Sequence, residues 1–301
     1  MTPALKPNDR ALSQTAQREV IAAVIVTHNR LAMLQQTVNA VHGQSRRPDI
    51  IIVVNNASTD GTAEWLKNVE FTTVVTQENT GSSGGQFTGL RVAFDLNPDW
   101  IWCMDDDVVP APDCLEQLLG NSNMPVRVPL RIAPDGAPQF GVDTIRFNFS
   151  NPFAGLWAEM LAGRHIGCGN IYVEGPSFEG PLIHCSVVEA IGLPDKDFFI
   201  FADDSDFFIR SHRAGFRAEL VASAKLHRLL PFSMQKTAEW KRYYEIRNIV
   251  TLDKRYGSMA VKLFRPLYYA AKMWLGSESG SERRAVIQGF LHGITGRLGR
   301  L

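Results

Sequence analysis

The sequence predicts an α/β protein built on a mostly parallel, doubly wound sheet that is flanked by helices and followed by a C-terminal helical extension. Continuous apolar runs at residues 20–26 and 50–54 have the composition of strands buried on both faces, as in a parallel sheet. Between them, residues 31–42 carry apolar side chains near helical spacing. Together the three segments predict a β-α-β unit.

The alternation of strands and helices continues to about residue 104. Residues 72–76 and 100–104 are the third and fourth strand candidates, and residues 86–95 are predicted to form the helix between them. From 110 to 181 the pattern is less regular and Pro and Gly are frequent, which is typical of an insertion that shapes a substrate pocket. Sheets of this kind bind ligands beyond the carboxyl ends of their strands, so we expect the site there.

The second half of the chain carries further helical patterns. Residues 182–192 have helical spacing, and residues 207–214 are predicted to form a helix opened by acidic residues. Lys and Arg interleave with aromatic residues at 231–301, which suits either an amphipathic helix on a membrane surface or a helix that packs its aromatic face on the main domain. We therefore divide the chain into a polar segment at 1–19, a main domain at 20–230 and this C-terminal helical region.

Length and composition limit the classes of function. The chain has 301 residues, and 31 Lys plus Arg balance 31 Asp plus Glu, so no global charge favours nucleic acid and we expect no such partner. Its four cysteines are widely spaced and form no Cys-x-x-Cys pair, which favours a reducing cytoplasm over a zinc or disulfide framework. There is no signal-peptide pattern and no membrane-spanning apolar run. We expect a cytoplasmic protein, either soluble or peripheral at the inner face of the cytoplasmic membrane.

Three consecutive carboxylates, Asp105, Asp106 and Asp107, directly follow the fourth strand candidate. Like charges at the end of a buried strand need water or a cation, and hard oxygen ligands select Mg²⁺ or Mn²⁺. In an extended segment Asp105 and Asp107 point to one side and Asp106 to the other. The alternative is a solvated turn or a helix N-cap cluster, since Pro110 and Pro112 follow closely. We favour the prediction of a divalent-metal site.

Polar loops follow the other three strand candidates, and we expect them to converge with the triple Asp on one crevice. They span residues 27–30, 55–62 and 79–85. The glycines of the third loop would let backbone N–H groups approach a diphosphate, with Gly84 and Gly85 leading into a helix; a plain mobile loop is the alternative. This loop matches neither the dinucleotide fingerprint nor the P-loop, which disfavours a dehydrogenase or a kinase.

A second acidic cluster, Asp203, Asp204 and Asp206, lies among the phenylalanines of residues 197–210. The helix macrodipole favours carboxylates at a helix N-terminus, and capping explains one or two of them. Three carboxylates beside so much aromatic surface favour a role in chemistry.

The order of these motifs resembles that of the inverting family-2 glycosyltransferases with the GT-A fold. The resemblance runs from about residue 20 to 228, with a looser match at 244–248. The motifs that carry it are Val-Thr-x-Asn-Arg at 26–30, Asn-Ala-Ser-Thr-Asp-Gly-Thr at 56–62, Asn-x-Gly-x-x-Gly-Gly at 79–85, the triple Asp, and Asp-Asp-x-Asp at 203–206 with Arg210 closing the segment. The full set most resembles the bacterial galactofuranosyltransferases and their rhamnosyltransferase relatives.

The resemblance implies a role for each acidic motif. Asp105 and Asp107 would hold a divalent cation, Mn²⁺ or Mg²⁺, that bridges the donor's diphosphate, and His227 matches the family's histidine metal ligand. Asp204 matches the general base, which takes a proton from an acceptor hydroxyl as that oxygen attacks the anomeric carbon opposite the leaving group. Burial among phenylalanines would raise the pKa of Asp204 toward the range useful for a base. Asp203 would raise it further or contact the acceptor.

The resemblance also places a nucleotide site and a sugar pocket. The residues expected to bind the nucleotide are Thr27, Asn29, Arg30, Asn55, Asn56, Asp60, Gly84 and Asp106. The residues expected to shape the acceptor and sugar pocket are Trp157, Phe178, Glu179 and Asp203, with core packing as the alternative for at least one of them. Asn55 stands where the family often has Asp, so it can accept from a uracil or thymine N3–H but without the charge-assisted component.

We therefore expect a metal-dependent inverting glycosyltransferase that acts on a cell-envelope glycan or lipid-linked acceptor. The first donor candidate is UDP-galactofuranose, and dTDP-rhamnose is the alternative. A sugar nucleotidyltransferase is disfavoured because residues 79–86 contain no Lys or Arg to hold a triphosphate. A non-catalytic nucleotide-sugar sensor would need no base and is disfavoured by the second acidic cluster.

Overall fold

The computed structural model describes residues 18–70, 72–167, 170–231 and 239–301. The predicted N-terminal segment lies outside these residues except for Arg18 and Glu19, as does Cys168, whereas Cys103, Cys114 and Cys185 are free thiols.

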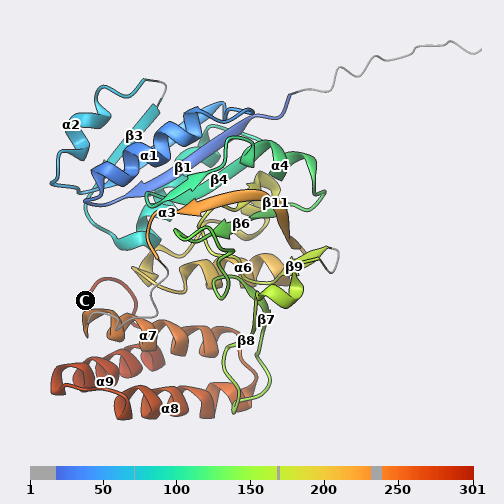
Figure 1. Ribbon diagram of the computed structural model, residues 1–301. Coiled ribbons are helices and arrows are strands. Elements are labelled where there is room, and N and C mark those ends of the chain that lie inside the picture. Colours follow the sequence, from blue (N-terminus) through green and yellow to red (C-terminus); the bar gives the residue numbers. More distant parts are fainter. Residues whose placement is uncertain (1–17, 71, 168–169, 232–238) are drawn as a thin grey trace, which may run out of the picture.

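Nine strands of the described chain form the central sheet (Figure 1). Its first half is parallel throughout and has the order β3 (Thr72–Gln77), β2 (Ile50–Asn56), β1 (Ile21–Thr27), β4 (Trp100–Asp105). Every residue of β1 is buried, as continuous apolar runs predict for a strand covered on both faces. The four predicted strands and their parallel arrangement are confirmed.

The second half of the sheet is mixed. Its order is β10 (Leu182–His184), β6 (Val126–Ile132), β11 (Ala218–Arg228), β5 (Val108–Pro110), and β9 (Ile171–Val173) pairs with β11. The long strands β6 and β11 are parallel to each other, and β10 is antiparallel to both of its neighbours. The sheet as a whole is mostly parallel, as predicted.

One predicted element in this half is wrong in part. Residues 182–192 were expected to be helical throughout, but Leu182–His184 is the strand β10, and the helix α5 spans only Cys185–Ile191. A strand of three residues is too short to show a period-2 pattern, and it forms because it fits between β4 and β6.

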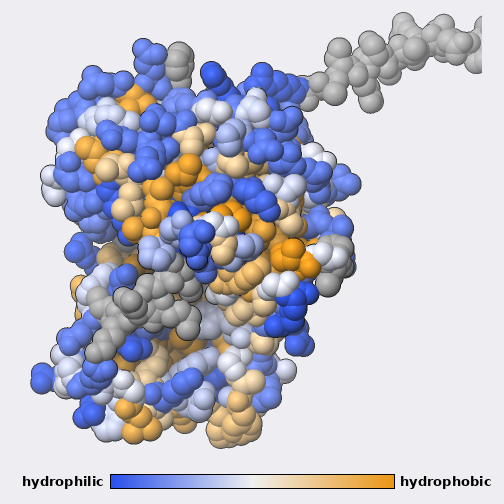
Figure 2. Space-filling view, in the orientation of Figure 1, coloured by the Kyte–Doolittle hydropathy of each residue, from blue (hydrophilic) through white to orange (hydrophobic). Residues whose placement is uncertain are grey.

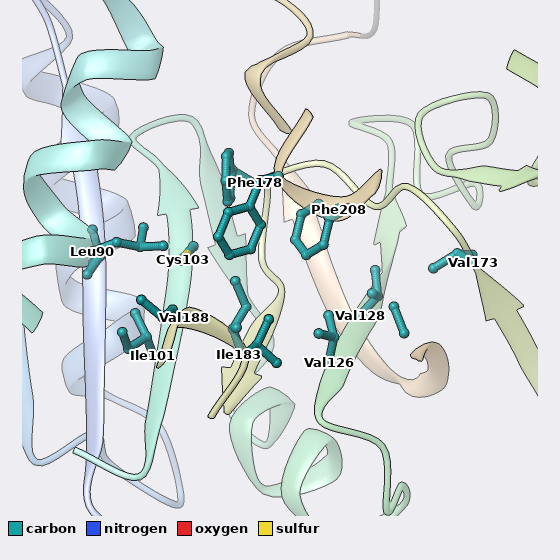
Figure 3. Packing of buried hydrophobic residues seen from close by; sticks show 14 of the residues in the cluster. Leu90, Ile101, Cys103, Val126, Val128, Val173, Phe178, Ile183, Val188 and Phe208 are labelled. Atoms are coloured by element: carbon teal, nitrogen blue, oxygen red, sulfur yellow. The ribbon is translucent and has the colours of Figure 1, made fainter. Parts of the chain in front are cut away.

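Helices cover both faces of the sheet, and the alternation along β1 separates two cores. Ile21, Ala23 and Ile25 face α1 (Leu31–His42), the short α2 (Thr62–Leu66) and α4 (Cys114–Gly120). The intervening residues of β1 belong to the core that contains α3 (Gly81–Asp95), α5 and α6 (Asp203–Arg213). Figure 3 shows part of this second core, where Leu90 of α3 lies near Cys103 of β4.

The glycine-rich segment forms the first turns of α3 rather than a loop before it. The helix predicted at 86–95 begins at Gly81, so Gly84 and Gly85 are helical. A Cβ atom on Gly84 would overlap Thr80, and one on Gly85 or Gly89 would overlap a valine of β1. Gly85 and Gly89 therefore let α3 pack directly on the sheet, and Gly84 leaves room for the side chain of Thr80.

A hairpin and three long helices complete the molecule. Strands β7 (Thr144–Phe147) and β8 (Trp157–Met160) form a separate two-stranded sheet. Helices α7 (Glu239–Tyr256), α8 (Met259–Leu275) and α9 (Gly280–Thr295) form a layer below the main domain in Figure 1, which confirms the predicted C-terminal helices. Among the described helices, none combines the length and the apolar composition needed to cross a bilayer.

Candidate active site

Two cavities meet at the carboxyl end of β4, and Asp105 and Ser82 line both of them. We call the first the acidic cavity. Its volume is about 570 Å³, and it is bordered by Asp203, Asp204 and Glu179. We call the second the loop cavity. Its volume is about 530 Å³, and its polar lining comes from Thr27, His28, Arg30, Asn56, Asn79, Asp106, Asp107 and Lys241. The loops that follow β1, β2, β3 and β4 converge there, as expected for a sheet of this kind.

Asp106 and Asp107 are held by the loop that follows β1. The Thr27 hydroxyl donates to Asp106 Oδ2 at 2.7 Å, and Arg30 Nη1 lies 3.1 Å from Asp106 Oδ1 and 2.9 Å from Asp107 Oδ2. The strand ends at Asp105, so the alternation expected for an extended segment does not continue through the run. Asp106 and Asp107 instead share one guanidinium, which neutralises part of their charge.

Asp105 is less neutralised than its neighbours. Its Oδ1 accepts one hydrogen bond of 3.3 Å from Gln86 Nε2. Burial raises the pKa of Asp105 well above its usual range, and the nearby charges of Asp107 and Glu179 raise it further. A carboxylate in this position, where two cavities join, is one that a bound cation would stabilise.

Asp105 and Asp107 therefore supply hard oxygen donors at the loop cavity, and this donor chemistry fits Mg²⁺ or Mn²⁺. The structure does not bring His227 to them. That histidine is exposed on β11, opposite Val109 of β5, and lines neither cavity. In the described part of the chain, no group of three or more His, Cys, Asp or Glu side chains is arranged to hold a metal ion.

Asn29 and Asn55 connect the loops after β1 and β2. Asn29 Oδ1 accepts from the backbone N–H of Thr59 at 2.7 Å, and Asn55 Oδ1 accepts from that of Ser58 at 3.0 Å. Asn55 is 1% exposed, and its amide oxygen is already bonded within its own loop. Both residues shape the loops of the cavity rather than its lining.

Asp60 and Asn56 also organise this region. Asp60 accepts from the backbone N–H of Leu31 at 2.9 Å and from the Thr62 hydroxyl at 2.6 Å, so it ties the start of α1 to the start of α2. Asn56 Nδ2 donates to the carbonyl of Gly81 at 2.9 Å and lines the loop cavity. Gly84, inside α3, lines neither cavity.

The second acidic cluster separates into two side chains at the cavity and one structural anchor. Asp203 and Asp204 begin α6 and line the acidic cavity. Asp206 is 1% exposed and points away from it, bonded to Arg255 Nη1 at 2.8 Å and to the Tyr256 hydroxyl at 2.7 Å. This division explains why three carboxylates occur together.

Burial perturbs both carboxylates at the cavity. Desolvation, and next the charge of Asp204, raise the pKa of Asp203 to about 7. Desolvation raises the pKa of Asp204 to about 6, although Oδ1 accepts a hydrogen bond of 2.6 Å from the backbone N–H of Ser205. A carboxyl group with its pKa near neutrality suits proton transfer at ordinary pH.

The chain enters α6 through a strained turn. Phe199, Phe201 and Ala202 have φ of 65°, 72° and 66°, in the left-handed region that L-residues seldom adopt. Phe199 contributes to the loop cavity, whereas Phe201 and Ala202 contribute to the acidic cavity. The turn therefore separates the two cavities and delivers Asp203 and Asp204 into one of them.

Helix α7 holds this turn. Asn248, which is fully buried, donates through Nδ2 to the carbonyls of Ile200 at 2.8 Å and Phe201 at 2.7 Å, and more weakly to that of Phe198 at 3.2 Å. Arg247 Nη2 donates to the Phe198 carbonyl at 2.6 Å. Strained conformations persist only where the surroundings determine them, and these bonds are such a determinant.

The residues predicted for the sugar pocket border the acidic cavity. Trp157 of β8 packs edge to face on Phe201, with ring centroids 5.8 Å apart. Phe178 is 5% exposed and packs on Phe207 and Phe208, so core packing is a large part of its role. Figure 3 shows Phe178 beside Phe208 in the core.

Glu179 belongs to a buried ionic network. Its carboxylate lies 3.2 Å from Arg131 Nε and 3.5 Å from Arg228 Nη2, and Arg131 also pairs with the buried Asp143. Burial raises the pKa of Glu179, while the two arginines oppose that shift. This network forms one side of the acidic cavity.

Comparison with known proteins supports the family suggested by the motifs. Residues 22–125 match the family model described as glycosyl transferase family 2. The galactofuranosyltransferase GlfT1 of Mycolicibacterium smegmatis is 30% identical over 203 residues, which cover 65% of this chain and 67% of the relative. The chain belongs to glycosyltransferase family 2. The GlfT1 of Mycobacterium tuberculosis is 28% identical over 206 residues, with 65% of this chain and 66% of the relative covered. The chain thus spans about two thirds of the length of these relatives.

Solved structures confirm that the fold of this glycosyltransferase is GT-A. GalNAc-T7 with UDP, GalNAc and Mn²⁺ superposes with a TM-score of 0.61 at 12% identity, over 92% of this chain and 56% of the other. TarS 1–349 of S. aureus gives 0.57 at 15% identity, over 92% and 82%. The mannosyltransferase PcManGT from Pyrobaculum calidifontis, in complex with GDP-Man and Mn²⁺, gives 0.54 at 17% identity, over 95% and 77%.

The structure of this glycosyltransferase adds site residues that the sequence did not single out. Ser82 borders both cavities, and His28 Nδ1 lies 2.7 Å from the Asn56 carbonyl oxygen at the edge of the loop cavity. Trp240 and Lys241 of α7 line the same cavity. His28 lies inside a motif that was recognised, so it was within reach of sequence reasoning. Ser82 likewise lies inside the recognised motif at 79–85, whereas Trp240 and Lys241 come from a helix far along the chain and carry no local signal.

Gly81→Ala is expected to lower the free energy of unfolding of this glycosyltransferase by about 2–5 kcal/mol. Gly81 has φ of 75°, and an added Cβ would overlap the carbonyl oxygen of Phe199 in the strained turn. Gly136→Ala is the matched control, because Gly136 has φ of 85° but no described atom within 4 Å of the added Cβ. Denaturant unfolding measures both, and equal losses would contradict a tight contact between α3 and the turn.

Proposed function

We propose that this family-2 glycosyltransferase is metal-dependent and inverting, and that it transfers galactofuranose from UDP-galactofuranose to a cell-envelope glycan or lipid-linked acceptor. Residues 20–230 form the catalytic domain, and residues 231–301 are its C-terminal helical region. The observation that carries the proposal is the pair of cavities that join at Asp105, one bordered by polar loops and the other by two carboxylates with raised pKa. The identity to GlfT1 supports the choice of sugar.

In this proposal the nucleotide lies in the loop cavity. His28, Asn56 and Arg30 present polar groups there, and Trp240 offers an aromatic face. Asn29, Asn55 and Asp60 keep the loops in place through their internal hydrogen bonds. Asp105 and Asp107, which line the cavity, would hold a divalent cation. When bound, such a cation stabilises negative charge on a departing diphosphate.

The acceptor occupies the acidic cavity. Asp204 accepts the proton of an acceptor hydroxyl while that oxygen forms a bond to the anomeric carbon of the donor sugar, and the bond from that carbon to the diphosphate oxygen breaks. Asp204 and the loop cavity lie on different sides of the junction at Asp105, which supports attack opposite the leaving group. A single displacement of this kind inverts the anomeric centre. Trp157 and Asp203 contact the acceptor or the sugar.

A donor screen tests the proposal. Purified protein is incubated with UDP-galactofuranose, UDP-galactose, UDP-glucose or dTDP-rhamnose, with and without Mn²⁺, and the released nucleoside diphosphate is measured. We expect Mn²⁺-dependent release of UDP from UDP-galactofuranose. Turnover of dTDP-rhamnose alone would instead establish the rhamnosyltransferase alternative. Formation of pyrophosphate from a nucleoside triphosphate and a sugar phosphate would establish a nucleotidyltransferase.

We also propose that the protein acts in the cytoplasm, at the inner face of the cytoplasmic membrane, because a lipid-linked acceptor would be found there. The C-terminal region is the part that would touch the membrane.

A further inference from the structure

Helix α8 exposes an apolar stripe. Its exposed apolar side chains form two neighbouring rows with spacings of four and seven residues, which places them on one half of the helix surface. They are Met259 at 71% exposed, Leu263 at 59%, Phe264 at 54%, Leu267 at 57%, Tyr268 at 49%, Trp274 at 39% and Leu275 at 74%. A helix on the surface of a protein in water usually exposes its polar face, so this stripe indicates a partner.

The opposite face of α8 makes polar contacts with the rest of the molecule. Arg265 is fully buried and pairs with Asp253 of α7, and the hydroxyl oxygen of Tyr269 accepts from the backbone N–H of Leu156 in the β7–β8 loop at 2.9 Å. These contacts fix the orientation of the helix. The apolar stripe faces outward because the other side of the helix is committed to α7 and to the hairpin.

Helix α9 extends the apolar surface. Ile287 and Leu291 are 50% and 53% exposed, and a groove of about 380 Å³ between α8 and α9 is lined almost entirely by apolar side chains, with Trp274 at one side. In Figure 2, orange and tan atoms lie along the lower edge of the molecule, in the region that α8 occupies in Figure 1.

The exposed charges of α8 and of the first turn of α9 are mostly positive, and Glu278 lies in the connection between the two helices. Helix α8 contains no Asp or Glu, and its exposed Lys272 is joined by the exposed Arg283 and Arg284 of α9. Arg283 lies over the ring of Trp274, 5.0 Å from its centroid. Aromatic and aliphatic side chains bordered by Lys and Arg match the interface of a bilayer that carries anionic lipids.

The β7–β8 hairpin connects this surface to the acidic cavity. Phe153, at the tip of its loop, is 84% exposed, and the carbonyl of Asn148 in the same loop accepts from Arg265 of α8 at 2.7 Å. In Figure 1 the loop reaches down to the end of α8. At its other end the hairpin provides Trp157 and Met160 to the wall of the acidic cavity.

We propose that the exposed faces of α8 and α9, together with the tip of the β7–β8 loop, bind the surface of an anionic membrane. The bound hairpin then leads from the lipid surface to the acidic cavity, so the acceptor is a lipid-linked glycan that stays anchored in the membrane while its sugar end enters the cavity. The second statement rests on the proposed transferase activity; the first does not, and it assigns the membrane contact proposed above to specific residues.

Sedimentation with phospholipid vesicles tests the surface. The full chain should bind vesicles of phosphatidylcholine mixed with phosphatidylglycerol, and bind pure phosphatidylcholine more weakly. The double variant Leu263→Glu with Leu267→Glu should lower the partition coefficient at least about tenfold, and Phe153→Glu should lower it less. Lys272→Glu and Arg284→Glu should each lower it about fivefold on anionic vesicles alone.

Matched controls lie on the catalytic domain. Leu96→Glu replaces a side chain that is 48% exposed at the end of α3, and Lys67→Glu reverses an exposed charge beyond α2; neither should change vesicle binding. Losses equal to those of the α8 variants would overturn the proposal. So would absence of binding by the unchanged chain, or a dimer in sedimentation velocity that the α8 variants abolish without any vesicle binding.

An assay in solution, which measures the release of UDP from the donor in the presence of Mn²⁺, distinguishes failure of this inference from failure of the proposed function. The α8 variants should release UDP at the unchanged rate, since their sites lie away from both cavities. If no donor is turned over by the unchanged chain but vesicles are bound, the proposed function fails and the surface stands. If donor is turned over and vesicles are not bound, the surface fails alone.

Discussion

Asp204→Asn is expected to slow sugar transfer by about 10²–10⁴-fold while binding of UDP and Mn²⁺ stays within about twofold of the unchanged protein. The amide keeps the shape of the carboxylate and can still accept from the backbone N–H of Ser205, but it cannot take a proton. Single-turnover transfer measures the rate, and calorimetric titration with UDP and Mn²⁺ measures binding.

Asp203→Asn is the matched control, because Asp203 starts the same helix and lines the same cavity. We expect a smaller loss of transfer from that variant, through the acceptor contact and the altered pKa of its neighbour. A larger loss from Asp203→Asn than from Asp204→Asn would exchange the roles of the two carboxylates. Full activity of Asp204→Asn would remove it from the mechanism.

The pH dependence gives a second measure of the same residue. A general base acts in its ionised form, and burial raises the pKa of Asp204 to about 6, so the transfer rate should fall as the pH drops through about 6. The fall should approach tenfold per pH unit below that value. In Asp204→Asn the residual rate should lack this acidic limb.

The raised pKa values of Asp203 and Asp204 also predict that Asp204→Asn, which lowers the transfer rate, makes the folded protein more stable. In the folded protein Asp203 and Asp204 have pKa values above the 3.8 of an ordinary Asp, so ionising them costs folding free energy. This cost is absent at low pH and complete at a pH above both folded values. Asp204→Asn should therefore raise the free energy of unfolding by about 1–3 kcal/mol at pH 8 and by much less at pH 4. Denaturant unfolding at the two pH values measures the difference.

The loop cavity could be predicted from the sequence because each of its motifs directly follows a strand that has a clear sequence pattern. A continuous apolar run such as that of β1 is a strong local signal, and parallel strands bring the loops at their carboxyl ends together without further information. The convergence of the loop at 27–30 with the triple Asp follows from topology alone. That Arg30 bridges Asp106 and Asp107 does not, because it depends on side-chain geometry.

The second half of the central sheet has weaker strand patterns in the sequence. Every residue of strand β6 is buried, although Arg127, Pro129 and Arg131 are among them. This composition does not predict a buried strand. Those arginines are tolerated because partners elsewhere in the chain satisfy them: Arg131 pairs with Asp143, and Arg127 Nη1 donates to the carbonyl of Leu118. A pattern whose explanation lies in distant partners cannot be read from the local sequence.

The match at 244–248 illustrates the same limit. The resemblance to the family extends loosely to these residues, but it gives no physical reason for them. In the structure Asn248 reaches back almost fifty residues to the carbonyls before Asp203, so helix α7 helps to hold the chain where it enters α6. That contact is open to a direct test.

Asn248→Ala is expected to reduce the rate constant of transfer at least about tenfold, because a displacement of about 1 Å in a catalytic group can cost 10²-fold. It should also lower the free energy of unfolding by about 2–4 kcal/mol. Three carbonyls at 198, 200 and 201 lose a buried donor, and the left-handed conformations of Phe201 and Ala202 lose what holds them. Asp203 and Asp204 follow directly in the chain and would move with the turn.

Thr251→Ala separates this effect from a general loss of stability. Thr251 lies one helical turn further along α7, is also buried, and bonds only within the helix, through its hydroxyl to the carbonyl of Arg247. It should cost about 1 kcal/mol and leave the transfer rate constant unchanged at a temperature where both variants are folded. Asn248→Asp keeps the volume but faces the three carbonyls with a carboxylate, so it should be at least as harmful as Asn248→Ala. Suppose that Asn248→Ala keeps the transfer rate constant and the fall of that rate below about pH 6. The turn at 199–202 would then keep its conformation without Asn248, and this residue of α7 would contribute to stability alone.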